Sequence, residues 1–257
     1  MNAAIAYGFI MIVMIGLWLI SLKIRDVSIV DLFWGIGFGA VAILLYLVRP
    51  KSDLYTIALV MMPSIWALRY SIHLFKRNWG HGEDVRYTKL RSWVKDDRAF
   101  VWLSLKKVFI LQGNLMFVVA LPVIVGLSFT APPLFPALIW IGGAIWLIGL
   151  VTEAWADRQL KAFKADTSKR GTILDTGLWR YSRHPNYFGN SVLWWGIFIA
   201  ACAHPWAVLT IIGPLTMTHF FINITGVATL EKKMSREKPA YKEYMKRTRM
   251  FIPGPPR

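Results

Sequence analysis

Charge and cysteine are both scarce in this sequence. Only 17% of its 257 residues are charged, where a soluble domain carries roughly a quarter. Among the charged residues the acidic ones are the fewer, with 14 Asp and Glu against 30 Lys and Arg. The one cysteine, Cys202, excludes an intrachain disulfide, and its apolar surroundings favour a buried, inert side chain. These shortages argue against an ordinary soluble domain and favour a membrane protein.

Motifs of soluble nucleotide-binding and hydrolytic domains are also missing. The sequence has no Gly-x-Gly-x-x-Gly, no P-loop and no Gly-x-Ser-x-Gly, so a soluble Rossmann domain or hydrolase is not supported. Five histidines occur without the His-x-x-His or His-x-x-x-His spacing of a membrane desaturase: His73, His81, His184, His204 and His219. We therefore expect no metal site.

Apolar residues, in contrast, make up 56% of the chain and include 13 tryptophans. About 20 apolar residues cross the hydrocarbon of a bilayer as a helix. Seven stretches are predicted to do so: residues 3–22, 28–48, 54–73, 108–129, 134–155, 187–203 and 206–226. The first lacks the basic flank and small-residue cleavage site of a signal peptide, so we expect it to be retained. The prediction is an all-α integral membrane protein with one catalytic domain over residues 1–257.

The basic residues predict the orientation of these spans. Residues 74–107 hold nine Lys and Arg, 156–186 hold seven and 227–257 hold nine, together 25 of 30. The positive-inside bias places these segments in the cytosol, with the N-terminus outside and the C-terminus inside. Cytosolic loops facing anionic lipid explain the net charge of +16 better than nucleic acid does, and a phosphate-bearing cofactor is a second use for it. Apolar residues at helical spacing in the tail, 227–257, predict a helix lying on a surface.

Ionisable side chains inside predicted spans are costly and indicate function by default. Asp31 in the second span and Arg69 in the third are expected at similar depth, where they could form an ion pair. The alternatives are a purely packing role, or an Arg69 that reaches to the headgroups. Glu153 and Asp157 lie one turn apart at the end of the fifth span. Three alternating glycines, within residues 35–39, predict close approach of a neighbouring helix.

The densest polar segment is residues 177–190, at the cytosolic end of the sixth span. Its polar members include Arg180, Tyr181, Arg183, His184, Asn186 and Tyr187. Arginine forks match phosphate oxygens, and aromatic faces stack on planar rings. Pro185 in the first helical turn would leave amide N–H groups for an anion. A basic collar for lipid headgroups is an almost equally good interpretation of the composition.

The segment Gly177-Leu-Trp-Arg-Tyr-Ser-Arg-His-Pro-Asn-Tyr-Phe-Gly189, followed by Trp194-Trp195-Gly196, resembles the signature of the bacterial DUF1295 proteins. These belong to the steroid 5α-reductase-like superfamily of membrane enzymes. Weaker resemblances occur in the expected order along the chain: Asp31-Leu-Phe-Trp-Gly35, Trp66-Ala-Leu-Arg69, Leu111-Gln112-Gly113, Glu153-Ala-Trp-Ala-Asp157-Arg-Gln159, Leu230-Glu231-Lys232, Tyr241-Lys-Glu-Tyr244 and Phe251-Ile-Pro253.

The resemblance implies a seven-span fold that holds NADPH at the cytosolic side of a bacterial inner membrane, with a lipid-accessible substrate cavity between the early spans. It implies cofactor contacts by residues in or beside the family's motifs: Glu153, Asp157, Lys164, Arg180, Tyr181, Arg183, His184, Asn186, Tyr187 and Arg249. Asp31 falls close to the acidic residue beside the substrate carbonyl of steroid reductases. Arg69 and Tyr70 fall near that family's His-Tyr-x-x-Arg segment, so these three are the catalytic candidates.

The implied reaction is hydride transfer from NADPH to a C=C bond conjugated to a carbonyl, in a lipophilic substrate such as a steroid-like, isoprenoid or fatty-acyl enone. Negative charge develops on the carbonyl oxygen, which requires a donor there. Burial in the bilayer favours the neutral, donating form of Asp31, and Tyr70 is another donor. If Asp31 is ion-paired it stays charged and cannot donate.

Two other classes remain open. Arg-His-Pro-x-Tyr-x-Gly also resembles the segment that isoprenylcysteine and phospholipid methyltransferases use around S-adenosylmethionine. Those enzymes commonly have an acidic pair near the tail, where this chain has Glu231 before Lys232. A non-enzymatic scaffold would not need so many converging polar groups. The adjacent Gln-Glu pair of the steroid reductases is absent, which leaves the substrate open, and the oligomeric state is not readable.

Overall fold

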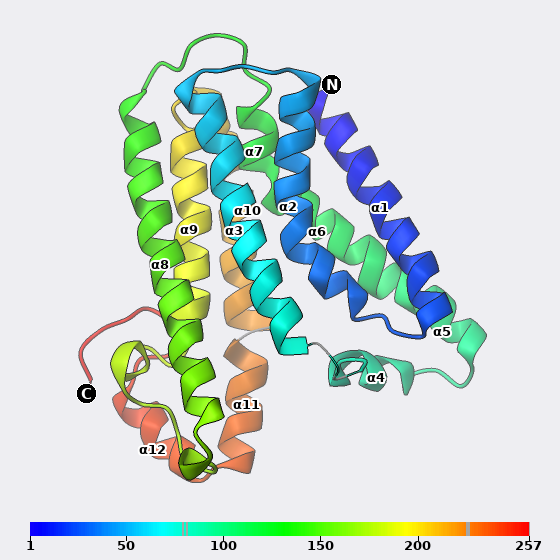
Figure 1. Cartoon of the computed structure of the whole chain (residues 1–257), viewed down its shortest axis with the longest axis vertical. Helices are drawn as coiled ribbons and strands as arrows, with labels where there is room; N and C mark the ends of the chain where they lie inside the picture. Colours follow the sequence, from blue (N-terminus) through cyan, green and yellow to red (C-terminus); the bar gives the residue numbers. More distant parts are fainter. Residues whose placement is uncertain (79, 81, 225–226, 257) are drawn as a thin grey trace. The chain divides into compact units, whose positions relative to one another are not determined.

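The computed structural model describes residues 1–78, 80, 82–224 and 227–256, and all regular elements in these ranges are helical, as predicted. The chain forms two compact units. The N-terminal unit comprises Met1–Ile139 and Ala201–Gly213, and the C-terminal unit comprises Trp140–Ala200 and Pro214–Arg257. Figure 1 labels the helices along the chain.

The N-terminal unit begins with three long helices, α1 (Asn2–Ile24), α2 (Ile29–Val48) and α3 (Leu54–Asn78). Glycines let α2 and α3 approach closely: a Cβ on Gly35 would lie 2.7 Å from the Tyr70 ring, and one on Gly39 would lie 3.2 Å from the Ser64 backbone. The expected packing role of the alternating glycines is thereby confirmed.

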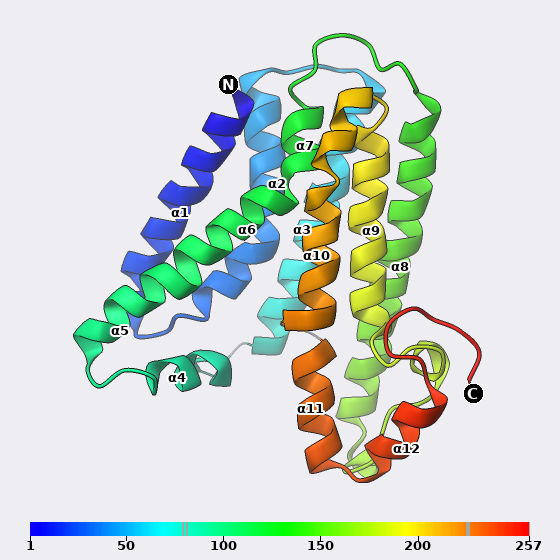
Figure 2. The ribbon, with the colours of Figure 1, turned by 180° about the vertical axis from the view of Figure 1, so that it is seen from behind.

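The fourth predicted span begins earlier than residue 108. A helical segment runs from α5 (Asp97–Ser104) through a π-helical turn (Leu105–Ile110) into α6 (Leu111–Val119), and α7 (Leu121–Gly126) follows. Figure 2 shows α5 and α6 continuing one into the other. The Asp96 side chain caps the start by accepting from the Ala99 N–H. The expected boundary was wrong because exposed Lys106 and Lys107 lower the local hydropathy inside a continuous helix.

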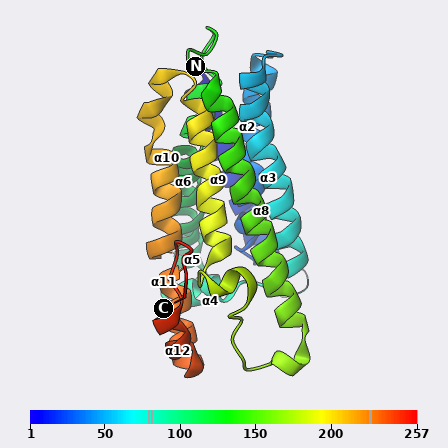
Figure 3. The ribbon, with the colours of Figure 1, turned by 90° about the vertical axis from the view of Figure 1, so that its left-hand side faces the viewer.

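The C-terminal unit is built on α8 (Ala137–Ala165), of which it contains all but the first three residues, and α9 (Pro185–Ala201). These two helices run side by side (Figure 3). Their contact is nearly backbone on backbone: a Cβ on Gly149 would lie 2.4 Å from the Leu193 nitrogen, and one on Gly196 would lie 2.4 Å from the Trp146 nitrogen. Only glycine permits this approach.

The remaining elements follow a 3₁₀ turn (Pro205–Thr210). They are α10 (Ile212–His219) with a π-helical extension (Phe220–Ile224), then α11 (Val227–Glu237) and α12 (Ala240–Arg247). The tail therefore contains two helices, divided near Pro239, where one was expected. Tyr241 and Tyr244 are buried, so α12 packs against the protein through its apolar side.

Six helical segments within the described ranges are long and apolar enough to cross a membrane. They correspond to six of the seven expected spans, and the chain is a multi-pass membrane protein by this criterion. The other expected span, 187–203, is helical as α9, whose 17 residues make it shorter than these six.

Candidate functional site

A tight turn after α8 positions the dense polar segment. Gly177 has a φ of 60°, a conformation that favours glycine, and a Cβ there would lie 2.2 Å from the Gln159 amide nitrogen. Gln159 Oε1 accepts from the Leu178 N–H at 3.1 Å. The Trp179 indole donates to the Ala156 carbonyl of α8 at 3.2 Å. The 3₁₀ turn Gly177–Arg180 is thus fixed to the end of α8 before α9 begins.

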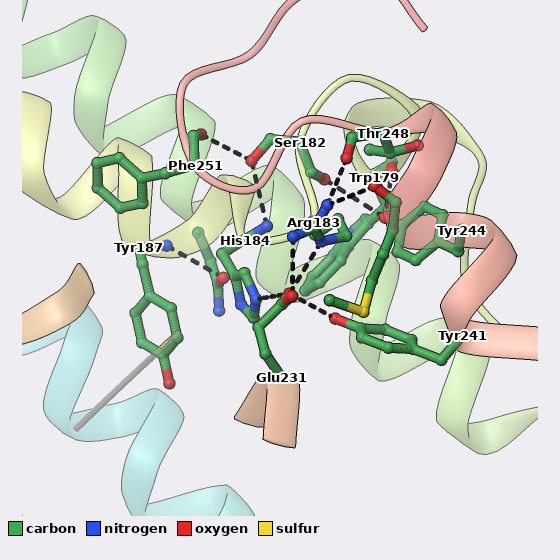
Figure 4. Close-up of polar contacts among 12 residues, drawn as sticks. Trp179, Ser182, Arg183, His184, Tyr187, Glu231, Tyr241, Tyr244, Thr248 and Phe251 are labelled. Atoms are coloured by element: carbon green, nitrogen blue, oxygen red, sulfur yellow. Dashed lines mark hydrogen bonds and ion pairs between the residues drawn. The ribbon is translucent and has the colours of Figure 1, made fainter. Parts of the chain in front are cut away.

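Arg183 joins three parts of the C-terminal unit. Its Nε and Nη2 donate to the two carboxylate oxygens of Glu231 on α11, at 2.9 and 2.8 Å. Its Nη1 donates to the carbonyls of Met245 and Thr248 at the end of α12, at 3.0 and 2.6 Å. These carbonyls would otherwise lack partners at a helix C-terminus. Figure 4 shows the guanidinium between the carboxylate and this helix end.

Glu231 is the centre of this network. Besides Arg183, His184 Nε2 lies 2.9 Å from its Oε1, and the Tyr241 hydroxyl donates to the same oxygen at 2.8 Å. Burial raises the pKa of Glu231, but the hydrogen bonds from His184, Arg183 and Tyr241 outweigh burial and lower its pKa to about 2. The carboxylate is therefore ionised at neutral pH and accepts only, so His184 donates through Nε2. We call Arg183, His184, Glu231 and Tyr241 the carboxylate clamp.

The segment after α12 is fastened to the clamp by main-chain contacts. The Arg183 N–H donates to the Arg249 carbonyl at 2.9 Å, and the Gly254 N–H donates to the Tyr181 carbonyl at 3.1 Å. The Ser182 hydroxyl donates to the Phe251 carbonyl at 2.7 Å (Figure 4). Residues 249–254 thereby complete the surroundings of residues 181–184.

The first turns of α9 carry a second set of polar contacts, directed at α8. The Asn186 amide donates to Asp157 at 3.1 Å, and the Asn190 amide donates to Glu153 at 3.0 Å. Asp157 and Glu153 are both buried. Asn186 Oδ1 also accepts from the Tyr187 N–H at 3.0 Å. We expected the main-chain N–H groups of this first turn to be left for an anion, but the Tyr187 N–H is already engaged.

The structure brings together six of the ten residues expected to contact a cofactor, through the clamp and the adjoining turns of α9: Glu153, Asp157, Arg183, His184, Asn186 and Tyr187. The other four, Lys164, Arg180, Tyr181 and Arg249, are exposed in the same unit. The main chain of two of them makes contacts at the site: the Arg249 carbonyl accepts from the Arg183 N–H, and the Tyr181 carbonyl accepts from the Gly254 N–H.

Asp31, expected to be catalytic, lies in the N-terminal unit with partners from α4 (Val85–Arg91). Arg86 Nη2 forms an ion pair with Asp31 Oδ2, and the Tyr87 hydroxyl donates to Asp31 Oδ1 at 2.8 Å. Gln112 of α6 donates to the Tyr87 oxygen at 3.2 Å. Burial, then the Asp31 charge, raises the pKa of Tyr87, so its phenol is neutral at neutral pH.

The other two catalytic candidates lie on α3. Tyr70 is partly buried and stacks on Trp66 with ring centroids 5.1 Å apart. Arg69 is also partly buried. We expected Arg69 as a partner of Asp31, whereas the ion pair described for Asp31 is with Arg86. No sequence signal indicated this pair, because α4 was interpreted as part of a loop.

Sequence reasoning also missed Arg86 and Tyr87, and it noted Gln112, Glu231 and Tyr241 in family motifs without assigning them to the site. Two signals were available. Asp84 precedes α4 as an N-cap that accepts from the Arg86 N–H, and Tyr241 and Tyr244 have the spacing of one helix face.

Among the described residues, no group of three or more His, Cys, Asp or Glu side chains could hold a metal ion. His81 lies outside the described residues.

Comparison with known proteins agrees with the motif resemblance. The family model described as "Protein of unknown function (DUF1295)" matches residues 17–248. The uncharacterized protein C594.04c of Schizosaccharomyces pombe (strain 972 / ATCC 24843) is 23% identical over 263 aligned positions, which cover 92% of this chain and 75% of that protein. No solved structure matches the chain at a significant level.

Proposed function

We propose, from the premise that this chain belongs to the DUF1295 family, that it is a membrane reductase. It would use NADPH to reduce a C=C bond conjugated to a carbonyl in a lipophilic, steroid-like, isoprenoid or fatty-acyl substrate. The observation that carries the proposal is the carboxylate clamp. An ionised carboxylate, a guanidinium and an imidazole are buried together at the start of α9, where the family resemblance implies the cofactor.

The polar groups of the C-terminal unit fit the chemistry of NADPH. Asp157 and Asn186 offer the acceptors and donors that sugar hydroxyls and amides require. The exposed guanidiniums of Arg180 and Arg249 can pair with phosphate oxygens. When bound, NADPH supplies the hydride. The clamp holds the first turn of α9 and so fixes Asn186 relative to Asp157.

The N-terminal unit supplies groups suited to a substrate carbonyl. Both oxygens of Asp31 accept, from Arg86 and from Tyr87, which counts against our first hypothesis that Asp31 is the proton donor. The one hydroxyl hydrogen of Tyr87 is given to Asp31, so Tyr87 holds Asp31 in position and Tyr70 is kept as the candidate donor. A phenol that donates to the substrate can stabilise negative charge developing on its oxygen. Arg69 and Tyr70 remain catalytic candidates.

The alternative function is S-adenosylmethionine-dependent methyl transfer. One observation weighs against a catalytic base at Glu231: its two oxygens already accept from Arg183, His184 and Tyr241. A carboxylate held this way at a pKa of about 2 is a weak base. The reductase therefore remains our preferred function.

The proposal includes seven spans across a bacterial inner membrane, with the N-terminus outside and the C-terminus on the cytosolic side. A 17-residue helix such as α9 measures about 25 Å at 1.5 Å per residue, close to the roughly 30 Å of a hydrocarbon core. The basic segments of the sequence support this orientation.

Thermal unfolding of the protein purified in detergent distinguishes the two functions. NADPH is expected to raise the unfolding temperature, and S-adenosylmethionine is expected to leave it unchanged. Asn186→Ala should reduce the NADPH effect, because it removes the amide that faces Asp157. Asn114→Ala in the N-terminal unit, where the partly buried amide donates to the Ile110 carbonyl and accepts from Tyr7, is the control. Stabilisation by S-adenosylmethionine alone would contradict the reductase.

A further inference from the structure

An open pocket of about 320 Å³ lies in the C-terminal unit, and none of the four clamp residues lines it. It is lined by Asp175, Thr176, Arg180, Arg247, Thr248 and Pro256. Three separate parts of the chain meet here: the turn before α9, the end of α12 and the segment that follows it. Five of the six lining residues carry a polar or charged side chain.

Two guanidiniums line this pocket, and they differ in whether they are ion-paired. Arg247 Nη2 is paired with Asp175 Oδ2 at 2.9 Å. Within the part of the chain that the structure describes, no hydrogen bond or ion pair engages the Arg180 guanidinium, which is exposed. With one carboxylate against two guanidiniums, the lining carries a net positive charge. A pocket of this composition favours an anion.

The hydrogen-bonding groups narrow the class of anion. Guanidinium forks match the tetrahedral oxygens of phosphate, and the hydroxyl of Thr176 adds a donor at the rim. The backbone around the pocket is held in place, because the Thr248 hydroxyl donates to the Arg180 carbonyl at 3.3 Å and the Thr248 carbonyl accepts from Arg183. The backbone that carries Arg180 and Arg247 is thus held to the clamp through Thr248.

We propose that this pocket is a phosphate-binding site. Its ligand is a phosphate group, carried either by a soluble phosphate ester or by a lipid headgroup at the membrane surface. Tyr181 in the turn before α9 and Met250 and Ile252 in the segment after α12 are exposed, at 45%, 40% and 64% of their surface. They give a lipid headgroup an apolar neighbourhood without excluding a soluble ester. The pocket shares Arg180 with the proposed NADPH contacts, but phosphate binding here does not rest on the proposed reduction.

The test measures binding by the protein in nanodiscs of uncharged, zwitterionic lipid. Inorganic phosphate and adenosine 2′-monophosphate probe the soluble source, and nanodiscs containing phosphatidic acid probe the lipid source. Arg180→Ala and Arg247→Ala should each weaken binding by at least about tenfold, the usual effect of removing one charge-assisted contact. Lys246→Ala is the matched control, since it removes one positive charge from the same helix end without lining the pocket.

The outcomes separate cleanly. Binding of the soluble probes that falls in the two arginine variants and persists in the lysine variant supports a soluble ester. A response confined to phosphatidic acid, with the same dependence on the arginines, supports a lipid headgroup. The proposal is overturned if no probe binds, or if Lys246→Ala has the same effect as the arginine variants. Phosphate binding without NADPH-dependent turnover of a model enone would keep this site while removing the reductase.

Discussion

At the scale of single residues, the clamp and the ion pair of Asp31 both join side chains that are far apart in sequence. Arg183 and Glu231 are separated by 48 residues, and Asp31 and Arg86 by 55. The residues of segment 177–190 could be recognised because they are contiguous and their types suit anion binding. Their partners could not, since a pairing across 48 residues is fixed by tertiary packing and leaves no local periodicity.

Glu231→Ala is expected to destabilise the protein by about 3–5 kcal/mol, because it leaves the buried Arg183 guanidinium without its carboxylate. Chemical unfolding in detergent measures this. Glu243→Ala is the control: it breaks the exposed pair with Lys246 on α12 and should cost under about 1 kcal/mol. Equal effects of the two variants would mean that the clamp does not stabilise the fold.

The same carboxylate gives stability a dependence on pH. The pKa of Glu231 falls from 4.5 to about 2 on folding, so its contribution is complete above pH 4.5 and is lost as the pH drops toward 2. The loss is on the order of 3 kcal/mol. Glu231→Gln lacks this group, so its stability difference from the wild type should shrink across that window. A constant difference from pH 6 to pH 2.5 would contradict the assignment.

Tyr70→Phe removes one hydroxyl from the N-terminal unit. If Tyr70 stabilises charge on the substrate oxygen, the variant should lose about 100-fold in kcat while its unfolding temperature changes little. Turnover of a model enone under NADPH measures this. Tyr7→Phe, which removes an exposed hydroxyl that donates to Asn114, should retain full activity. Unchanged kcat in Tyr70→Phe would rule out Tyr70 as the donor.

At the scale of helices, hydrophobic runs predicted most of the elements, and polar content decided where prediction failed. The first three helices lie close to the expected residues. The fourth starts at Asp97, earlier than predicted. The prediction was late because Lys106 and Lys107 interrupt the apolar run, while the helical segment continues through them. The short α4 was not predicted, since seven residues with three basic side chains resemble a solvated loop. Asp31 binds this helix through an ion pair with Arg86 and a hydrogen bond from Tyr87.

The packing of α8 on α9 yields a comparison of two glycines on one helix. Gly149→Ala would place a Cβ 2.4 Å from the Leu193 backbone nitrogen and should destabilise the protein by about 1–3 kcal/mol. Gly143 has nothing within 4 Å of its Cβ position, so Gly143→Ala should be neutral or stabilising by up to about 1 kcal/mol. Unfolding temperatures in detergent compare them, and the reverse order would refute the close approach.

At the scale of the molecule, the membrane class could be predicted from composition, whereas the division into two compact units could not. Apolar content and basic clusters are summed over the chain and survive any local error. The unit boundaries, at residues 139–140, 200–201 and 213–214, fall inside or beside helices and carry no change in composition.

Orientation in the membrane can be tested with single cysteines introduced after Cys202→Ser. A cysteine at exposed Pro132, in a connection without basic residues, should react with an impermeant maleimide applied to intact spheroplasts. A cysteine at exposed Lys169 should react only after permeabilisation. Labelling in the opposite pattern would reverse the proposed topology.

The fastening of residues 249–254 onto residues 181–184 has a consequence for biosynthesis. Arg183 emerges from the ribosome 65 residues before the Thr248 carbonyl that it needs, and Phe251 follows later still. The hydrogen bonds of Arg183 and Ser182 to this segment therefore form only after residues 245–251 have been synthesised. A chain that stops before residue 245 would leave the buried Nη1 of Arg183 without its two carbonyl acceptors.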